Sequence, residues 1–360
     1  MSTALTVVSL YFAFNIRFSH DILSWFPKKN PIRIATELID KNLKGTVNLE
    51  IVIDTHKPNG ILNPDLLKRM DMAAKDMENL EVNGIFGGKA FSIAVLLKEL
   101  NKGIHGNDPR FYTIPGNENT IAQEMLIFEN VAKKYVLSFT DSQYSLARFT
   151  IKVPFKESIR YIKFLNAVET YFSKHFPDTT ISVTGVVPLL VATSERVVKS
   201  VKESYTIAFI VITLLMILLI GNLPMGLLSM IPNLLPIVFA LGIMGLFKIP
   251  IDAATMMAGS IAIGLAVDDT IHFMHVFKQY YRESGSPSQA IQDTLQTTGR
   301  AMFATSLVLS LGFFVFVFSS MNNMVYFGVI TGLMIIVALL ADYFIYPSMM
   351  MLLMKDKSYS

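Results

Sequence analysis

The hydrophobic pattern divides the chain into a mixed first part and an apolar second part. Up to about residue 194, apolar positions form short runs that fit strands (47–54, 145–153 and 181–185) and amphipathic helices (64–77, 121–136 and 155–176). Asn63 and Pro64 fit the N-cap and first turn of a helix. Its apolar stripe consists of Leu66, Leu67, Met70, Ala73, Ala74 and Met77. This pattern predicts a soluble α+β domain over residues 19–194.

The second part contains stretches long enough to cross a bilayer, which requires about 20 residues per helix. We predict a membrane domain over residues 195–354 with five transmembrane helices, followed by a short cytoplasmic tail at 355–360. The helices are expected at residues 205–220, 223–247, 249–277, 301–318 and 324–341. Residues 1–18 contain a shorter apolar run without a basic n-region, which we interpret as a partial transmembrane helix rather than a signal peptide.

Charge and cysteine content narrow the classes of function. The net charge of +3 is small and dispersed, so nucleic-acid binding is not expected. The chain contains no cysteine, which excludes disulfides, thiolate nucleophiles and cysteine-bound metals. His20, His56, His105 and His175 lack metal-ligand spacing, so we expect neither a metal nor a cofactor.

The most informative residues are two adjacent acids in the third apolar stretch, Asp268 and Asp269. A charge near the bilayer centre costs about 2.5–3.5 kcal/mol on insertion scales, so such residues usually face protein or a water-filled path. On a helix, Asp268, His272 and His275 share one face, whereas Asp269 lies about 100° around the axis. We interpret this arrangement as a proton-titratable cluster.

Neighbouring polar residues fit more than one role. His272 suits either a proton relay or a hydrogen bond to a backbone carbonyl, and His275 suits the membrane interface. Thr305 and Ser306, on the next apolar stretch, are candidate hydrogen-bond partners of the carboxylates but would serve equally as packing residues. Asp342 ends the last stretch, where we expect it to anchor the helix at the membrane interface.

The segment around the two acids, GLAVDDTIHF at residues 264–273, resembles a motif of the resistance–nodulation–division (RND) superfamily, in the exporter branch with MMPL and Patched-like proteins. Other segments match in the same order, at 43–45, 49–54, 183–185, 231–236, 304–307, 327–328 and 341–342. The resemblance covers nearly the whole chain and corresponds to the second half of such a transporter. It implies an α-helical polytopic membrane bundle with an extracytoplasmic α+β domain of βαβ-type porter subdomains.

This resemblance also implies a function. The chain would be half of a proton-motive-force-driven exporter of lipids or other hydrophobic molecules in the plasma (inner) membrane. Asp268, Asp269 and His272 would relay protons, and a complementary N-terminal half or a second copy would be the partner. The alternative is a sterol-sensing-domain-like sensor or scaffold without transport. An intramembrane aspartyl protease needs two facing aspartates, which neighbours on one helix cannot provide, so we expect no enzyme.

Loop charge predicts the orientation of the membrane domain. Lys278, Arg282 and Arg300 lie in one loop, and two further lysines, at 355 and 357, follow the last stretch. The positive-inside rule places this loop and the C-terminus in the cytoplasm, so the α+β domain is expected on the opposite side.

Single-cysteine labelling tests this orientation cleanly because the chain has no native cysteine. In intact cells, an impermeant maleimide should react with Asn322→Cys and leave Ser286→Cys unlabelled. Both should react after the membrane is permeabilised, which controls for accessibility. The reverse pattern in intact cells would overturn the orientation.

Overall fold

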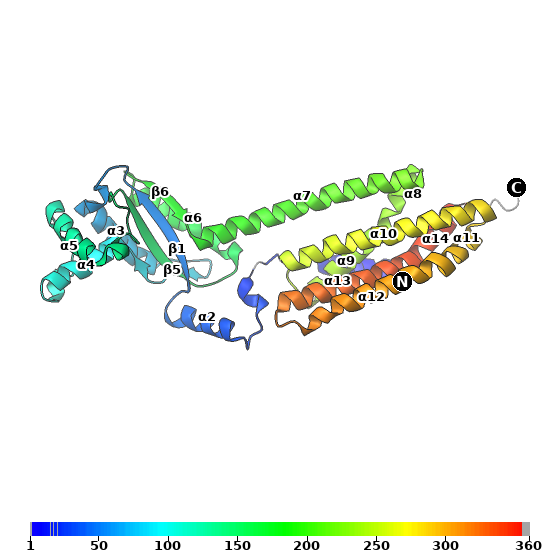
Figure 1. The fold of residues 1–360 in the computed structure, drawn as a ribbon, viewed down its shortest axis with the longest axis horizontal. Helices are drawn as coiled ribbons and strands as arrows, with labels where there is room; N and C mark the ends of the chain where they lie inside the picture. Colours follow the sequence, from blue (N-terminus) through cyan, green and yellow to red (C-terminus); the bar gives the residue numbers. More distant parts are fainter. Residues whose placement is uncertain (1, 15, 17, 20, 355–360) are drawn as a thin grey trace. The chain divides into compact units, whose positions relative to one another are not determined.

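The computed structural model describes residues 2–14, 16, 18–19 and 21–354, with side chains from residue 7 onward (Figure 1). The chain forms two compact units. One consists of residues 21–23 and 28–195, and the other of residues 24–27 and 196–354 with the described part of residues 1–20. The expected cytoplasmic tail, 355–360, lies outside the described residues.

A four-stranded sheet with the order β4-β5-β1-β6 forms the centre of the α+β unit. Its strands are β1 (Val47–Asp54), β4 (Ala90–Phe91), β5 (Leu146–Val153) and β6 (Thr180–Thr184). All neighbouring strands are antiparallel. The units β1–α3–β4 and β5–α6–β6 therefore each connect parallel strands with a third strand between them, which is the split βαβ arrangement of ferredoxin-like folds.

The core of this unit lies between the sheet and helices α3 (Pro64–Glu78) and α6 (Ser158–His175). Alternate residues of β1 are buried, as expected for a strand with one face on a core. The register places Leu49 opposite Ile151 and Ile51 opposite Phe149, so large apolar side chains meet across strands. Helices α4 (Ile93–Ile104) and α5 (Glu118–Val136) are inserted between β4 and β5, and α2 (Pro31–Asn42) precedes β1.

Local sequence signals explain the start of α3 and one turn that our prediction missed. Asn63 caps α3 by accepting hydrogen bonds from the backbone N–H groups of Asp65 and Leu66. All six residues of the predicted apolar stripe of α3 are buried. After α3, where we predicted no element, Asn83 (φ 56°) and Gly84 (φ 74°) connect a short hairpin of β2 (Glu81–Val82) and β3 (Ile85–Phe86). Two left-handed residues in a two-residue turn match the twist of antiparallel strands.

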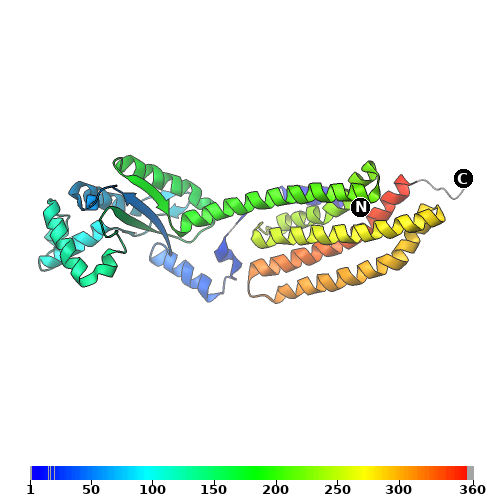
Figure 2. The ribbon, with the colours of Figure 1, turned by 45° about the horizontal axis from the view of Figure 1, so that its top comes forward.

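Five segments between residues 186 and 353 are long and apolar enough to cross a membrane, and Figure 2 shows their long helices. They comprise α7 (Val186–Ile220), α8 with α9 (Leu223–Leu228 and Met230–Phe247), α10 (Ala253–Ser284), α11 with α12 (Pro287–Thr294 and Arg300–Phe314), and α13 with α14 (Asn322–Leu340 and Tyr346–Leu353). The expected fold class, a helical membrane bundle with an α+β domain, is confirmed.

The last two segments are longer than the stretches 301–318 and 324–341 that hydropathy predicted, since each covers 32 residues. The reason is that π-helical turns at Leu295–Gly299 (η4) and Ala341–Ile345 (η6) continue the helices through residues that we interpreted as ends. A π turn absorbs an extra residue without terminating the helix.

The short N-terminal helix α1 (Ser2–Ala13) packs closely on α9 because two glycines of α9 leave room for its backbone. A Cβ atom at Gly242 would lie 2.6 Å from the Cα of Ser9, and one at Gly245 would lie 2.0 Å from the carbonyl oxygen of Phe12. Small residues at helix interfaces permit this approach in membranes.

The N-cap of α3 gives a stability test for the α+β unit. An isolated segment of residues 28–195 should be soluble without detergent, and Asn63→Ala should lower its free energy of unfolding by about 1 kcal/mol because two backbone N–H groups lose their partner. Asn63→Asp, which keeps an accepting oxygen, should change it little. Urea unfolding followed by circular dichroism measures both, and equal stability of the Ala and Asp variants would contradict the capping role.

Candidate functional site

Helix α10 carries the candidate site and has well-defined ends. Its N-cap is Asp252, whose carboxylate accepts the backbone N–H of Thr255, while the Thr255 hydroxyl bonds the backbone N–H of Asp252. At its C-terminus, Gly285 adopts a left-handed conformation (φ 70°), which is the usual helix stop. The acids at 268 and 269 therefore lie near the middle of a 32-residue helix.

One face of α10 is buried because small residues allow neighbouring helices to approach. Ala258, Ala262 and Ala266, spaced four residues apart, are 0%, 1% and 2% exposed. The first two pack in a cluster with side chains of α9 and α13. Gly259 faces α7, where the Tyr205 hydroxyl donates a hydrogen bond to the carbonyl oxygen of Met256. The rotation of α10 about its axis is thereby fixed.

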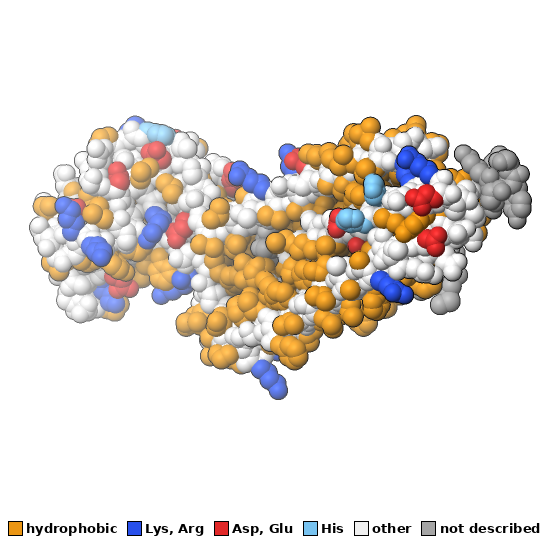
Figure 3. Space-filling model, turned by 45° about the vertical axis from the view of Figure 1, so that its right-hand side comes forward, with side chains coloured by type: hydrophobic (Ala, Val, Ile, Leu, Met, Phe, Trp, Pro, Cys, Tyr) orange, Lys and Arg blue, Asp and Glu red, His pale blue; other side chains and the backbone are white. Residues whose placement is uncertain are grey.

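The two adjacent carboxylates point in different directions. The side chain of Asp268 is 67% exposed and lies 3.6 Å, Oδ1 to Nε2, from that of His272, which is 66% exposed. His275 is exposed as well. Figure 3 shows a hydrophobic face on which histidine and acidic side chains are exposed together. Asp269 is half-buried, and its Oδ2 accepts a hydrogen bond of 3.2 Å from the Ser306 hydroxyl of α12.

A second polar group lies inside the bundle, where α9, α10 and the last membrane segment meet. Thr270 Oγ1 lies 2.9 Å from Asn233 Oδ1 and 2.9 Å from Asp342 Oδ1. All three residues are buried: Thr270 is 0% exposed, Asn233 is 3% exposed and Asp342 is 2% exposed. The amide Nδ2 of Asn233 donates to the carbonyl oxygen of Ser229, which orients the amide. We call these three side chains the Asn233–Thr270–Asp342 network.

The structure does not bring the site residues predicted from the sequence together into one cluster. Asp268 and His272 lie together on the exposed face, and Asp269 contacts Ser306. Thr305 is exposed and bonds carbonyl oxygens of its own helix, so it does not join them. The expected interface role of Asp342 is wrong, because the helix continues through η6 and α14 and leaves this side chain buried.

Sequence reasoning missed Asn233 and Thr270 as site residues. Thr270 follows the acid pair directly, but a threonine in an apolar helix is ordinarily a packing residue. Asn233 lies between Pro232 and Pro236, in the stretch 223–247 that we predicted only as a transmembrane helix. One signal in the sequence points to both residues: each is a polar side chain inside a membrane-length stretch, where polar residues usually have a function. The same is true of Asp342.

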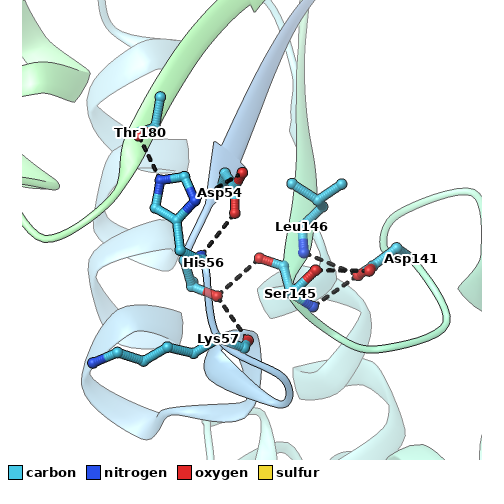
Figure 4. Close-up of polar contacts among 8 residues, drawn as sticks. Asp54, His56, Lys57, Asp141, Ser145, Leu146 and Thr180 are labelled. Carbon is cyan, nitrogen blue, oxygen red and sulfur yellow. Dashed lines mark hydrogen bonds and ion pairs between the residues drawn. The ribbon is translucent and has the colours of Figure 1, made fainter.

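The α+β unit contains a different polar cluster at the end of β1 (Figure 4). His56 Nε2 lies 2.7 Å from Thr180 Oγ1, and its Nδ1 lies 3.3 Å from Asp54 Oδ2. Acid, histidine and hydroxyl in this order resemble a nucleophilic triad. However, the His56 side chain is 62% exposed, whereas such chemistry relies on a site that excludes water. The cluster therefore serves to join the end of β1 to the start of β6.

No group of three or more acidic or histidine side chains within the described residues could hold a metal ion. The polar side chains of the candidate site described above carry carboxyl, hydroxyl, amide and imidazole groups. Such groups exchange protons and hydrogen bonds.

Comparison with known proteins identifies the family. The family model of the MMPL family matches residues 146–357, which is more than half of the chain. The chain belongs to the MMPL family. A Methanocaldococcus jannaschii protein named only as a membrane protein (MJ1562) is 28% identical over 157 residues. The match covers 44% of this MMPL chain and 40% of the archaeal protein, so it spans less than half of either.

The Asn233–Thr270–Asp342 network should contribute to the stability of the membrane unit. Thr270→Val preserves shape but leaves two buried oxygens without a partner, which should lower the free energy of unfolding by about 1–3 kcal/mol. The matched control is Thr305→Val, at an exposed position, which should change it by less than about 0.5 kcal/mol. Unfolding in detergent, followed by circular dichroism, measures both; equal losses would show that the network contributes nothing.

Proposed function

We propose that this MMPL-family chain is one half of a proton-motive-force-driven exporter of the RND type. Its cargo would be lipids or other hydrophobic molecules, and its partner a complementary N-terminal half or a second copy. Asp268, Asp269 and His272 would form the proton relay. The plasma (inner) membrane is the proposed location, with the α+β unit extracytoplasmic according to the loop charges.

The exposed polar face of α10 carries this proposal. Along it lie Ser260, Gly264, Asp268 and His272, four residues apart. A Cβ atom at Gly264 would meet no atom within 4 Å beyond the nearby backbone of its own helix. A single charge that faces lipid near the middle of a membrane helix costs about 2.5–3.5 kcal/mol. A second helix bundle placed on this face would remove the acid and the histidine from lipid, and the small residue at 264 would allow close approach.

The chemistry of these residues suits proton transfer. Asp268 and His272 lie within one helical turn of each other, so a proton can pass between carboxylate and imidazole with little movement, directly or through a water. Asp269 keeps its bond to Ser306 on α12, which ties its protonation state to this hydrogen bond between the two helices. One charge crossing 100 mV supplies about 2.3 kcal/mol, enough to shift a two-state packing equilibrium.

The proposed cargo is hydrophobic. Support comes from the family and from the resemblance to lipid exporters, since the polar groups described above suit proton exchange rather than recognition of a polar ligand. A membrane sensor without transport would share the same helices. Flux measurement separates the two functions.

The proposal predicts that this chain alone does not export. Vesicles that contain only this polypeptide should show no proton-dependent efflux of a fluorescent lipid, because the exposed face of α10 lacks its partner. Addition of a complementary half should restore efflux, and Asp268→Asn or Asp269→Asn should then reduce it to the level of empty vesicles while assembly is unchanged.

The matched control is Asp293→Asn on α11, the same substitution outside the proposed relay, which should retain efflux. Export by the lone chain, or full activity of both Asn variants in the complete system, would contradict the relay. Assembly without any flux, with or without a proton gradient, would favour the sensor.

A further inference from the structure

The Asn233–Thr270–Asp342 network has fewer hydrogens than its contacts require. Thr270 Oγ1 lies at hydrogen-bond distance, 2.9 Å, from an oxygen on each side. Each of these two contacts needs one hydrogen between its oxygens. The threonine hydroxyl supplies only one, and an amide oxygen and an ionised carboxylate supply none.

The missing hydrogen does not come from Asn233. Its Nδ2 donates to the carbonyl oxygen of Ser229 at 3.1 Å, one turn earlier on α9. Rotation of the amide by 180° would direct Nδ2 at Thr270, but it would also place Oδ1 against the Ser229 carbonyl, so two acceptors would face each other. Asp342 is the remaining source.

We propose that Asp342 carries a proton and donates it to Thr270, forming an intramembrane proton-binding site separate from the exposed Asp268–His272 face. The chain of donation then runs from Asp342 through the Thr270 hydroxyl to Asn233. Every contact receives one hydrogen. This site deepens the proposed function, on which its role in transport rests, but its protonation does not depend on transport.

The environment of Asp342 fits a neutral acid. Its Oδ2 is buried without a hydrogen-bond partner. A neutral C=O group left unpaired costs far less than an unpaired carboxylate oxygen in an apolar interior. The titratable groups that interact electrostatically with Asp342 are Asp269 from α10 and Tyr346 from α14. Neither of them is basic, so neither would favour an ionised carboxylate. On α9 the facing group is the amide of Asn233, and Tyr343 points away, donating to the carbonyl oxygen of Gly299.

A bound cation explains the geometry less well than a proton. Hard cations take six or more oxygens at about 2.3–2.6 Å. Here Thr270 Oγ1 lies 2.9 Å from one oxygen on each side, and both distances are those of O–H···O hydrogen bonds. The hydroxyl at the centre also bonds both neighbours, so none of its contacts is left for a metal.

Infrared spectroscopy of the purified chain in detergent tests the site directly. The wild-type protein at neutral pH should show the C=O stretching band of a protonated carboxylic acid, shifted in D₂O, and Asp342→Asn should lose it. Asp342→Asn should fold, because its amide can donate to Thr270 as the acid does. The control Asp293→Asn, the same substitution on the polar helix α11, should retain the band.

A second pair of variants keeps the test decisive if Asp342→Asn does not fold. Thr270→Val should shift the band, since the acid loses its acceptor, whereas Thr270→Ser should leave it in place. A band whose position and intensity are unchanged in Asp342→Asn, or no band in the wild type, would show that Asp342 is ionised. Thermal unfolding that depends on sodium rather than choline, and loses this dependence in Asp342→Asn, would identify a cation site instead.

These outcomes are distinguishable from failure of the proposed function. If the lone chain or its complete assembly does not export but the band is present and disappears in Asp342→Asn, the proton site stands and the exporter proposal fails. If the assembly exports without such a band, the exporter stands and the proton site fails.

Discussion

In hydrocarbon a polar side chain has no water to bond, so each polar group of a membrane helix must find its partner within the protein. The packing of this bundle follows from that constraint. Thr270 of α10 bonds Asn233 of α9 and Asp342 of the last membrane segment, and Ser306 of α12 bonds Asp269. The contacts of Thr270 continue the alanine face of α10, on which α9 and α13 approach closely. Polar pairing and small side chains together specify which helices meet.

The α+β unit was largely predictable because its signals are local. The strand at 47–54 and the helix capped by Asn63 depend on alternation, on a 3.6-residue period and on a capping side chain, all of which lie within a few residues. The order of the strands was not predictable from such signals. It depends on which segments pair across a hundred residues, such as Leu49 with Ile151. Asn83 and Gly84 carried a local hairpin signal that we overlooked.

The candidate site was predictable only in part, for the same reason. Helical geometry alone indicates that Asp268 and Asp269 diverge and that Asp268 shares a face with His272. The partners of Thr270 lie 37 and 72 residues away in sequence, and periodicity carries no information about contacts of that kind. Asp342 was misplaced because a carboxylate after an apolar run ordinarily marks a helix end, whereas here a π turn carries the helix onward.

The buried network and the exposed face are two consequences of one rotation of α10. Successive helix residues are separated by about 100°, so Asp268 lies roughly 200° from Thr270 around the axis. Turning α10 far enough to bury Asp268 would break both hydrogen bonds of Thr270. Asp342 would then remain buried without a hydrogen-bond partner. The internal network therefore holds Asp268 and His272 outward, on the exposed face of α10. In the exporter proposed above, these two residues would therefore exchange protons at that outer face, against the proposed second bundle, and not inside the bundle described here.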